Sequence, residues 1–500
     1  MAAAGNHAAP NCSRIFINSP LDIYIVYVTM VSSSNLRRIQ TMQKQAPAEN
    51  KMGVMPIPKL IVNMSLPMII SMLVQALYNI VDSFFVAQVS EQSLTAVSLA
   101  FPAQNLMIGM ATGTAVGVNA LLSRALGEKN QPMANTIAEH GVFLAMVGYV
   151  IFLIFGLFGV RAFFASQTDV AQIIQYGVDY LSVICCFSFG VFGQIMFERL
   201  MQSTGRTIYT MFTQGLGAII NIILDPVFIF VFHQGVKGAA IATVIGQIIA
   251  FGLAVYLNHT KNADVQLNIR EFRPRAHIVG RIYAIGVPSI IMVAIGSVMT
   301  FAMNKILIVY HVARETAATI FGVYFKLNSF VFMPVFGLNN GIIPIVAYNY
   351  GAQNRRRMIQ AIKISVIFVG SYTILGAIVF MTIPGALLGI FNASETMLLY
   401  GRPALRIIGS TFIFAGVCIA LGSSFQALGY GVYSMIVSLA RQLLVLVPAA
   451  YVLGRLGAQN GNPDLVWYSF PIAELMSLAV TLYLFSRLYR NVISAVPEGK

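Results

Sequence analysis

The sequence predicts an all-α, polytopic membrane protein with twelve transmembrane helices in two parallel six-helix repeats, an N-lobe and a C-lobe around a central cavity. Composition is the first observation: 57% of the 500 residues are hydrophobic and only 10% are charged, against about 25% in soluble domains. The second observation is a series of apolar stretches long enough to span a membrane, and the third is an internal repeat. So few charges cannot cover a water-exposed surface, whereas a bilayer removes that need.

Each predicted span contains about 20 mostly apolar residues, the length that crosses a bilayer. The runs Leu60 to Val81 and Gln92 to Ser123 hold no Asp, Glu, Lys or Arg. Spans are predicted over residues 60–87, 97–123, 140–160, 178–199, 208–232, 237–258, 282–309, 319–347, 361–384, 404–427, 432–454 and 466–486. The predicted domains are an extension (1–51), the N-lobe with helices 1–6 (52–260), a linker (261–281) and the C-lobe with helices 7–12 (282–500).

The first 51 residues do not fit this pattern. Asp22 to Val31 is an apolar run too short to span a membrane, and it lacks the basic start of a cleavable leader. We expect residues 1–51 to be disordered or to lie outside the working protein, with Met42 and Met52 as alternative starts.

Basic residues are distributed unevenly between the two sides of the membrane. With the N-terminus inside, 22 lysines and arginines fall in cytoplasmic segments, and the outer loops hold only Arg161, Lys237, Arg314, Arg402 and Arg455. The positive-inside rule therefore predicts that both termini are cytoplasmic. This asymmetry explains the net charge of +14, so we expect no nucleic-acid partner.

The two halves resemble each other at an offset of about 224 residues. The pattern Gln202-x-x-Gly205 recurs as Gln426-x-x-Gly429. Four further positions, Gly113, Gly117, Gly127 and Asn130, match Gly337, Gly341, Gly351 and Asn354. An even number of spans in each half gives both halves the same orientation, a recurring plan of secondary transporters with the binding site between the repeats. Three glycines four residues apart, Gly109, Gly113 and Gly117, predict close helix packing.

Acidic side chains inside predicted spans are expensive and indicate function by default. Asp82 ends the first apolar run, and Asp225 lies within the fifth span. Asn221 lies one helical turn before Asp225 on the same face. Pro226 has no amide hydrogen and leaves a backbone carbonyl without its usual partner, and Thr243 adds a hydroxyl. Oxygen groups of these kinds suit a small hard cation or a shared proton.

The repeat does not preserve this acidic cluster, because Leu443 and Val447 stand at the positions that match Asn221 and Asp225. A purely structural acid pair would have less reason to be confined to one half. Five other ionisable residues within spans are expected to form a secondary polar network, with Arg441 and Glu474 as a structural pair: Glu198, Lys305, Lys326, Arg441 and Glu474.

Several classes of protein are disfavoured. The chain contains no HExxH, no GxSxG, no cysteine–histidine pairing and no P-loop, so we expect neither an enzyme nor an ATP-driven pump, and no cofactor besides a coupling ion. A channel stays open as an alternative. A lipid-linked precursor flippase of a related fold is the main alternative, and it should show a cavity lined with many basic residues.

Several segments resemble the MATE (multidrug and toxic compound extrusion) transporters, particularly the bacterial DinF-like branch. The carrying segments are Ala76–Asp82, Gly117–Arg124, Asn221–Pro226, Gly235–Thr243, Pro344–Gly351 and Pro471–Glu474, and the resemblance runs from Pro56 to Arg490. It implies an antiporter of the bacterial inner (plasma) membrane, with membrane lipids around it, and we expect a monomer. Such an antiporter exports amphipathic cations, including antibiotics, in exchange for H+ or Na+ by alternating access.

The resemblance also implies a site. In that family the N-lobe cation site combines an Asp on helix 1, an Asn and an Asp on helix 5 and a Thr on helix 6. These residue types fall on Asp82, Asn221, Asp225 and Thr243, which we expect to bind H+ or Na+. Branches that use C-lobe acids carry them on helices 7 and 8, where this chain has Asn304, Lys305 and Lys326, so we expect no C-lobe cation site.

Overall fold

A computed structural model describes residues 50–268, 272–391 and 393–498, and all regular structure within these ranges is helical. One compact unit contains residues 49–267 and 273–500. The prediction about residues 1–51 lies almost entirely outside the described residues. Lys51, however, begins helix α3 (Lys51–Val54) of this unit.

The first half of the unit contains the N-lobe helices. They are α4 (Ile57–Val89), α5 (Glu91–Gly127), α6 (Gln131–Ile154), a π-helical turn η2 (Phe155–Gly159), α7 (Val160–Ala165), α8 (Ala171–Cys186), α9 (Phe189–Ser203), α10 (Thr207–Pro226), a π-helical turn η3 (Val227–Val231) and α11 (Gly235–Lys261). These helices cover the six predicted N-lobe spans, and most extend a few residues beyond the apolar windows.

The second half contains the C-lobe helices. They are α12 (Ala276–Tyr310), α13 (Arg314–Gly351), α14 (Arg355–Thr382), α15 (Pro384–Gly389), α16 (Glu395–Gly409), α17 (Phe412–Ala427), α18 (Gly431–Leu439), η5 (Ala440–Leu446), α19 (Val447–Asn460), η6 (Pro463–Tyr468), α20 (Ser469–Leu488) and η7 (Tyr489–Ile493). Within the described part of the chain, ten helices are long and apolar enough to cross a membrane, or twelve if each of two bent pairs is one span. The twelve predicted spans correspond to these.

The two bent pairs occupy equivalent positions in the two repeats. Between α8 and α9 and between α16 and α17 the chain bends by 44°. Because an unpaired backbone group is costly in hydrocarbon, the carbonyls at each bend accept hydrogen bonds from a backbone amide and from a hydroxyl group. Ser188 Oγ donates to the Cys185 carbonyl at 2.8 Å, and Thr411 Oγ1 donates to the Ile408 carbonyl at 2.7 Å.

Backbone conformation follows the repeat as well. Gly205 and Gly429 have positive φ angles of 84° and 89°, and the matched non-glycine residues Lys129 and Gln353 have 55° and 54°. Only glycine adopts such angles without strain. The sequence repeat therefore corresponds to a repeat of local geometry at the helix ends.

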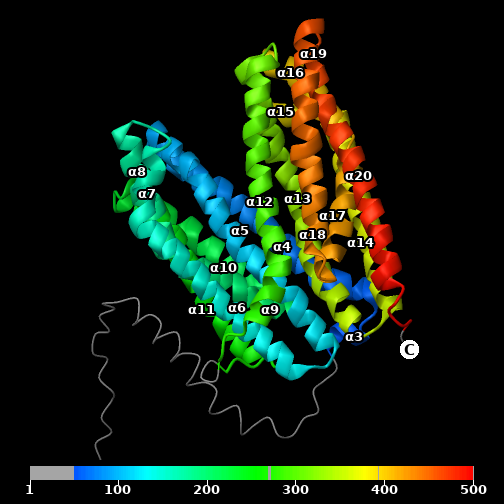
Figure 1. Cartoon of the computed structure of the whole chain (residues 1–500). Coiled ribbons are helices and arrows are strands. Elements are labelled where there is room, and N and C mark those ends of the chain that lie inside the picture. The colour runs from blue at the N-terminus through cyan, green and yellow to red at the C-terminus, as the bar shows by residue number, and fades with distance from the viewer. Residues whose placement is uncertain (1–49, 269–271, 392, 499–500) are drawn as a thin grey trace, which may run out of the picture. The chain divides into compact units, whose positions relative to one another are not determined.

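The lobes meet mainly along three pairs of helices, α5 with α12, α4 with α13 and α5 with α13 (Figure 1). A Cβ atom on Gly113 would lie 2.9 Å from the Gly286 carbonyl oxygen of α12, and one on Gly337 would lie 2.7 Å from Ile69 Cα of α4. Such spacing lets the backbones touch. The glycines predicted to allow close packing therefore lie at the junction of the lobes.

At one end of this junction the lobes are in direct backbone contact. A Cβ on Gly127 would lie closer than 2.5 Å to the Tyr348 carbonyl oxygen, and one on Gly351 equally close to the Arg124 carbonyl oxygen. The Arg124 guanidinium lies 4.8 Å from the centre of the Tyr350 ring. We call this end, defined by Gly127 and Gly351, the closed end.

Helix α3 ties both lobes together at the closed end. Asn50 Nδ2 donates to the Thr204 carbonyl of the N-lobe at 3.2 Å. From the C-lobe, Arg357 Nη2 donates to the carbonyls of Met52 at 3.1 Å and Met55 at 2.6 Å. Met52 is fully buried. This short helix therefore contributes to the closed arrangement through both polar and apolar contacts.

Candidate functional site

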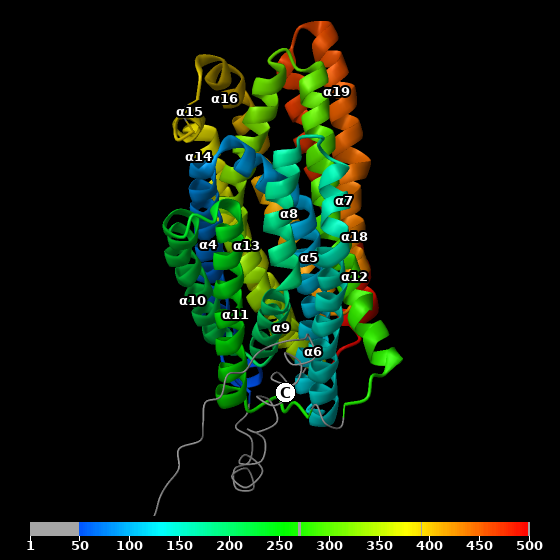
Figure 2. The same ribbon diagram turned by 90° about the vertical axis from the view of Figure 1, so that its left-hand side faces the viewer.

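The centre of the site lies on α10 and α11, which pack against one another and against α4 (Figure 2). Asn221 and Asp225 are both buried, one turn apart on α10, and α10 ends at Pro226, which cannot continue the hydrogen-bond ladder. Asn221 Nδ2 donates to Asp225 Oδ1 and to Thr243 Oγ1, each at 3.2 Å. Three of the four predicted cation-site residues are thus joined by hydrogen bonds.

The fourth residue, Asp82 on α4, lies within electrostatic range of Asp225. Three buried oxygens of this cluster have no hydrogen-bond partner among the described residues: Asp82 Oδ1, Asn221 Oδ1 and Asp225 Oδ2. All three are acceptors, and buried acceptors without a donor are costly. Carboxylate, amide and hydroxyl oxygens are the ligands that hard cations prefer. The residues therefore fit a Na+ ion, and they fit a proton bound by either carboxylate.

Two tyrosines also lie near Asp82 and Asp225, and the sequence analysis did not indicate either of them. Tyr78 and Tyr180 both lie within electrostatic range of Asp82 and Asp225. Tyr180 comes from α8, and Gln104 Nε2 donates to its hydroxyl at 3.3 Å. Tyr78 precedes Asp82 by four residues, so helical spacing was a usable signal for it, whereas only the tertiary fold brings Tyr180 to this site.

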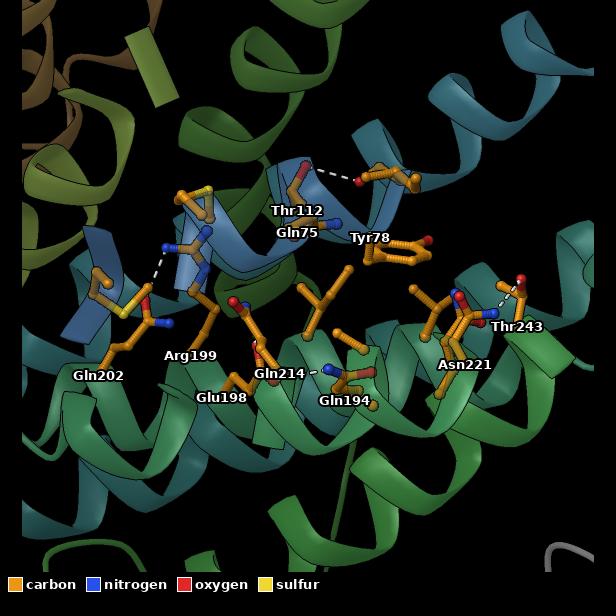
Figure 3. A pocket seen from close by; sticks show the side chains of 18 residues that line it. Gln75, Tyr78, Thr112, Gln194, Glu198, Arg199, Gln202, Gln214, Asn221 and Thr243 are labelled. Carbon is orange, nitrogen blue, oxygen red and sulfur yellow. Dashed lines mark hydrogen bonds between the residues drawn. The ribbon is translucent and has the colours of Figure 1, made fainter. Parts of the chain in front are cut away.

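A cavity of about 150 Å³ adjoins the cluster, with Tyr78, Asn221 and Thr243 among its lining residues (Figure 3). Asp82 and Asp225 do not line it; Asn221 and Thr243 are the cluster members that do. The volume is below the usual 300–1,000 Å³ of a pocket for drug-sized ligands. It has room for an ion with water and not for a large organic compound.

Glu198 lines the same cavity (Figure 3) and is only 2% exposed. Its carboxylate accepts hydrogen bonds from Gln194 at 2.9 Å, Thr213 at 2.7 Å and Gln214 at 2.8 Å. Three donors stabilise an ionised carboxylate in a buried position. Glu198 is thus satisfied by its neighbours, unlike Asp82 and Asp225.

Arg199 is a buried arginine of α9 at the junction of the lobes. It is 7% exposed. Its Nη1 donates to Gln202 at 2.9 Å and, across the junction of the lobes, to Asn340 of α13 at 2.9 Å. These acceptors allow the guanidinium to be buried, and Arg199 becomes a polar link between the lobes.

The five residues of the predicted secondary network do not form one network, which corrects that expectation. The pair of Arg441 and Glu474 is confirmed, with Nη1 and Oε1 3.2 Å apart. Lys326 lines a C-lobe cavity together with Arg441 and Glu474, whereas Glu198 lines the N-lobe cavity described above. Lys305 is exposed on α12. The apolar windows that predict the spans do not show which face of a helix a charged residue occupies. Residues on different faces were therefore grouped into one network.

Two parallel repeats of membrane-spanning helices, with a polar cluster in one repeat and cavities between them, define the class of secondary transporters. The family model described as MatE matches residues 67–227 and 288–452, one segment in each repeat. The chain therefore belongs to the MatE family of membrane transporters and is not an enzyme. Nothing in these matches separates the DinF-like branch from others, so that part of the resemblance stays a prediction.

Known relatives are similar over most of their length. "Multidrug export protein MepA" from Staphylococcus aureus is 25% identical over 436 residues, which cover 86% of this chain and 94% of the relative. The protein of the same name from Staphylococcus haemolyticus is 24% identical over 427 residues, covering 85% and 92%. A solved "outward-facing conformation of a multidrug resistance MATE family transporter" superposes with a TM-score of 0.83 at 24% identity, covering 91% of this chain and 99% of that one. The structural match supports the fold.

Proposed function

We propose that the protein is an antiporter that exports amphipathic small molecules, drugs and toxic cations among them, in exchange for H+ or Na+. The observation that carries this proposal is the cluster of three buried, unpaired acceptor oxygens on Asp82, Asn221 and Asp225. Their charge and lack of donors favour a transported cation over a purely structural role. The names of the staphylococcal relatives support multidrug export.

The closed end is assigned to the cytoplasm, because Arg124 and the run Arg355–Arg357 lie there and basic residues favour the inner side. With this orientation both termini are cytoplasmic, and the described state faces outward. We further propose a monomer, surrounded by lipid in a bacterial inner membrane.

Transport then follows alternating access. In the outward-facing state a cation enters the N-lobe cavity and reaches the oxygens of Asp82, Asn221 and Asp225, with the Thr243 hydroxyl nearby. Its charge offsets the repulsion between the two carboxylates, which alters the packing of α4 against α10 and favours release of the exported compound. One positive charge moving inward is worth about 2.3 kcal/mol per 100 mV, so the membrane potential contributes to the driving force.

The flippase alternative receives less support. It requires many basic residues in the cavity to bind a pyrophosphate group. Lys326 and Arg441 are the basic residues that line the C-lobe cavity within the described ranges, and Arg441 is paired with Glu474.

Proteoliposomes that contain the purified protein test the proposal, with a Na+ gradient or a pH gradient imposed separately and efflux of a fluorescent dye followed. We expect one gradient to drive efflux, and Asp82→Asn and Asp225→Asn to abolish it while the protein stays folded. Asp169→Asn, which changes an exposed carboxylate, is the matched control and should transport normally. Full transport by either cluster variant would refute the site, and efflux without either gradient would refute coupling.

A further inference from the structure

A large aromatic cavity lies on the C-lobe side of the junction, with a volume of about 890 Å³. Phenylalanines from five helices line it, among them Phe101 of α5, Phe301 of α12, Phe332 of α13, Phe412 of α17 and Phe470 of α20. The volume is in the range of pockets that enclose drug-sized ligands, and aromatic walls favour offset or edge-to-face contacts with a flat ring system. This cavity, unlike the N-lobe cavity, is large enough for an organic substrate.

An ion pair with spare hydrogen-bonding capacity lies in this aromatic cavity. Arg441 Nη1 donates to Glu474 Oε1 at 3.2 Å, and the side chains are 26% and 13% exposed. The other carboxylate oxygen, Glu474 Oε2, is buried without a partner, as is Asn304 Oδ1 in the same cavity lining. No second hydrogen bond holds the Arg441 guanidinium within the described residues. The pair therefore leaves both acceptors and donors unused.

The single bond is weak for these two groups, because a guanidinium and a carboxylate usually pair through two parallel hydrogen bonds. Lys326 does not complete the pair: its ammonium lies 5.9 Å from the centre of the Phe391 ring. A ligand that supplies a donor to Glu474 and an acceptor to Arg441 would satisfy more groups than the pair does alone.

Arg441 also occupies a junction between cavities. It lines the aromatic cavity and an adjoining cavity of about 460 Å³ that is bordered by Gly113 and Ile343. Thr112 lines both this second cavity and the small N-lobe cavity. A compound that moves from one cavity to the next therefore meets the Arg441 side chain.

We propose that Arg441 and Glu474 form an exchangeable ion pair that binds an aromatic zwitterion, with the ligand carboxylate on Arg441 and its ammonium group on Glu474 and Asn304. The inference rests on the proposed export function and names the substrate class of the C-lobe cavity. A simple cation that bound Glu474 in place of Arg441 would leave the guanidinium without its counter-ion, which is costly in a partly buried position. A zwitterion replaces both partners and leaves no charge unpaired.

Fluorescence titration of the purified full chain in detergent tests the proposal with three matched probes. Nε-dansyl-lysine is the zwitterion, its methyl ester is the cation, and its Nα-acetyl derivative is the anion. Since a hydrogen bond to a charged group contributes about 1.5–3 kcal/mol, we expect the zwitterion to bind about tenfold or more tightly than either derivative.

Each substitution should remove the preference for the zwitterion over one of the two derivatives. Arg441→Gln should bind the zwitterion and the ester equally, and Glu474→Gln should bind the zwitterion and the acetyl derivative equally. Arg455→Gln, at an exposed arginine of α19, is the control and should keep both preferences. If a single variant does not fold, the double variant Arg441→Gln/Glu474→Gln retains two neutral partners and should fold without preference.

Equal binding of the three probes by the unchanged protein would overturn the inference, as would an unchanged preference in the folded double variant. The dye efflux assay separates this failure from that of the proposed function. Gradient-driven efflux without a zwitterion preference refutes only the substrate class, whereas a zwitterion preference without efflux refutes only the antiport proposal.

Discussion

The close approach of Gly127 and of Gly351 to the backbone of the opposite lobe predicts how the closed end responds to a single methyl group. A Cβ at either position would lie closer than 2.5 Å to a backbone carbonyl oxygen of the other lobe, whereas ordinary contact begins at 3.4 Å. In Gly127→Ala and Gly351→Ala the backbones must therefore move apart by roughly 1 Å or more. Overpacking of this kind typically costs about 1–3 kcal/mol, so the closed arrangement should lose about fivefold to 150-fold in its population relative to an open one.

Electron–electron double resonance measures this shift. Spin labels at Lys261→Cys of the N-lobe and Gln360→Cys of the C-lobe report the separation at the closed end, in a background without the native cysteines. Both positions are exposed. We expect the alanine variants to add a population at longer distance.

Gly252→Ala is the matched control. A Cβ at this position in the interior of α11 meets nothing within 4 Å, so the distance distribution should not change. If both Gly127→Ala and Gly351→Ala fold and keep the original distribution, the argument that these glycines hold the lobes together is refuted.

Three further predictions concern stability. His311 lies in the loop between α12 and α13, where burial lowers its pKa below the usual 6.5 and its Nδ1 accepts a hydrogen bond from the Ala313 amide. The free energy of folding that neutral His311 contributes is therefore present above about pH 6.5 and is lost as the pH falls below it. The melting temperature of the purified protein should therefore fall on acidification by a smaller amount in His311→Gln, and equal falls would contradict this. Gly429→Ala should lower the free energy of unfolding by about 1–2 kcal/mol through its φ of 89° alone, since no neighbour lies within 4 Å; an unchanged urea midpoint would exclude this cost. Arg357→Met should cost about 1.5–3 kcal/mol and speed amide hydrogen exchange around Met52, and unaltered exchange there would show that α3 does not depend on Arg357.

The sequence predicted the helices and their repeat well, because both depend on local properties. The length of an apolar segment indicates whether it spans the membrane, and a matched glycine such as Gly351 indicates the same local backbone conformation as Gly127. The repeat could not predict that each of these glycines lies against the backbone of the other lobe, since equivalence between halves says nothing about distance. The same limit applies to the bends at Ser188 and Thr411, which lie inside apolar windows that continue on both sides.

For the site, the sequence indicated residues that share a helix better than residues from different helices. Helical spacing predicts that Asn221 and Asp225 share a face. Asp82 was indicated as an acid at the end of an apolar run and by the family resemblance, but only the packing of α4 on α10 brings it to the other two. The link from Arg199 to Asn340 could not be predicted from the sequence, because the two residues meet only when the lobes are assembled.

The bends at Ser188 and Thr411 have a consequence for mechanics. A proline kink removes a donor permanently, whereas a hydroxyl can exchange one carbonyl for the next as the angle changes. We therefore expect the segment beyond each bend to swivel while its backbone groups stay saturated in hydrocarbon. Since both repeats carry such a bend, we expect each lobe to have its own adjustable hinge, independent of the surface along which the lobes meet.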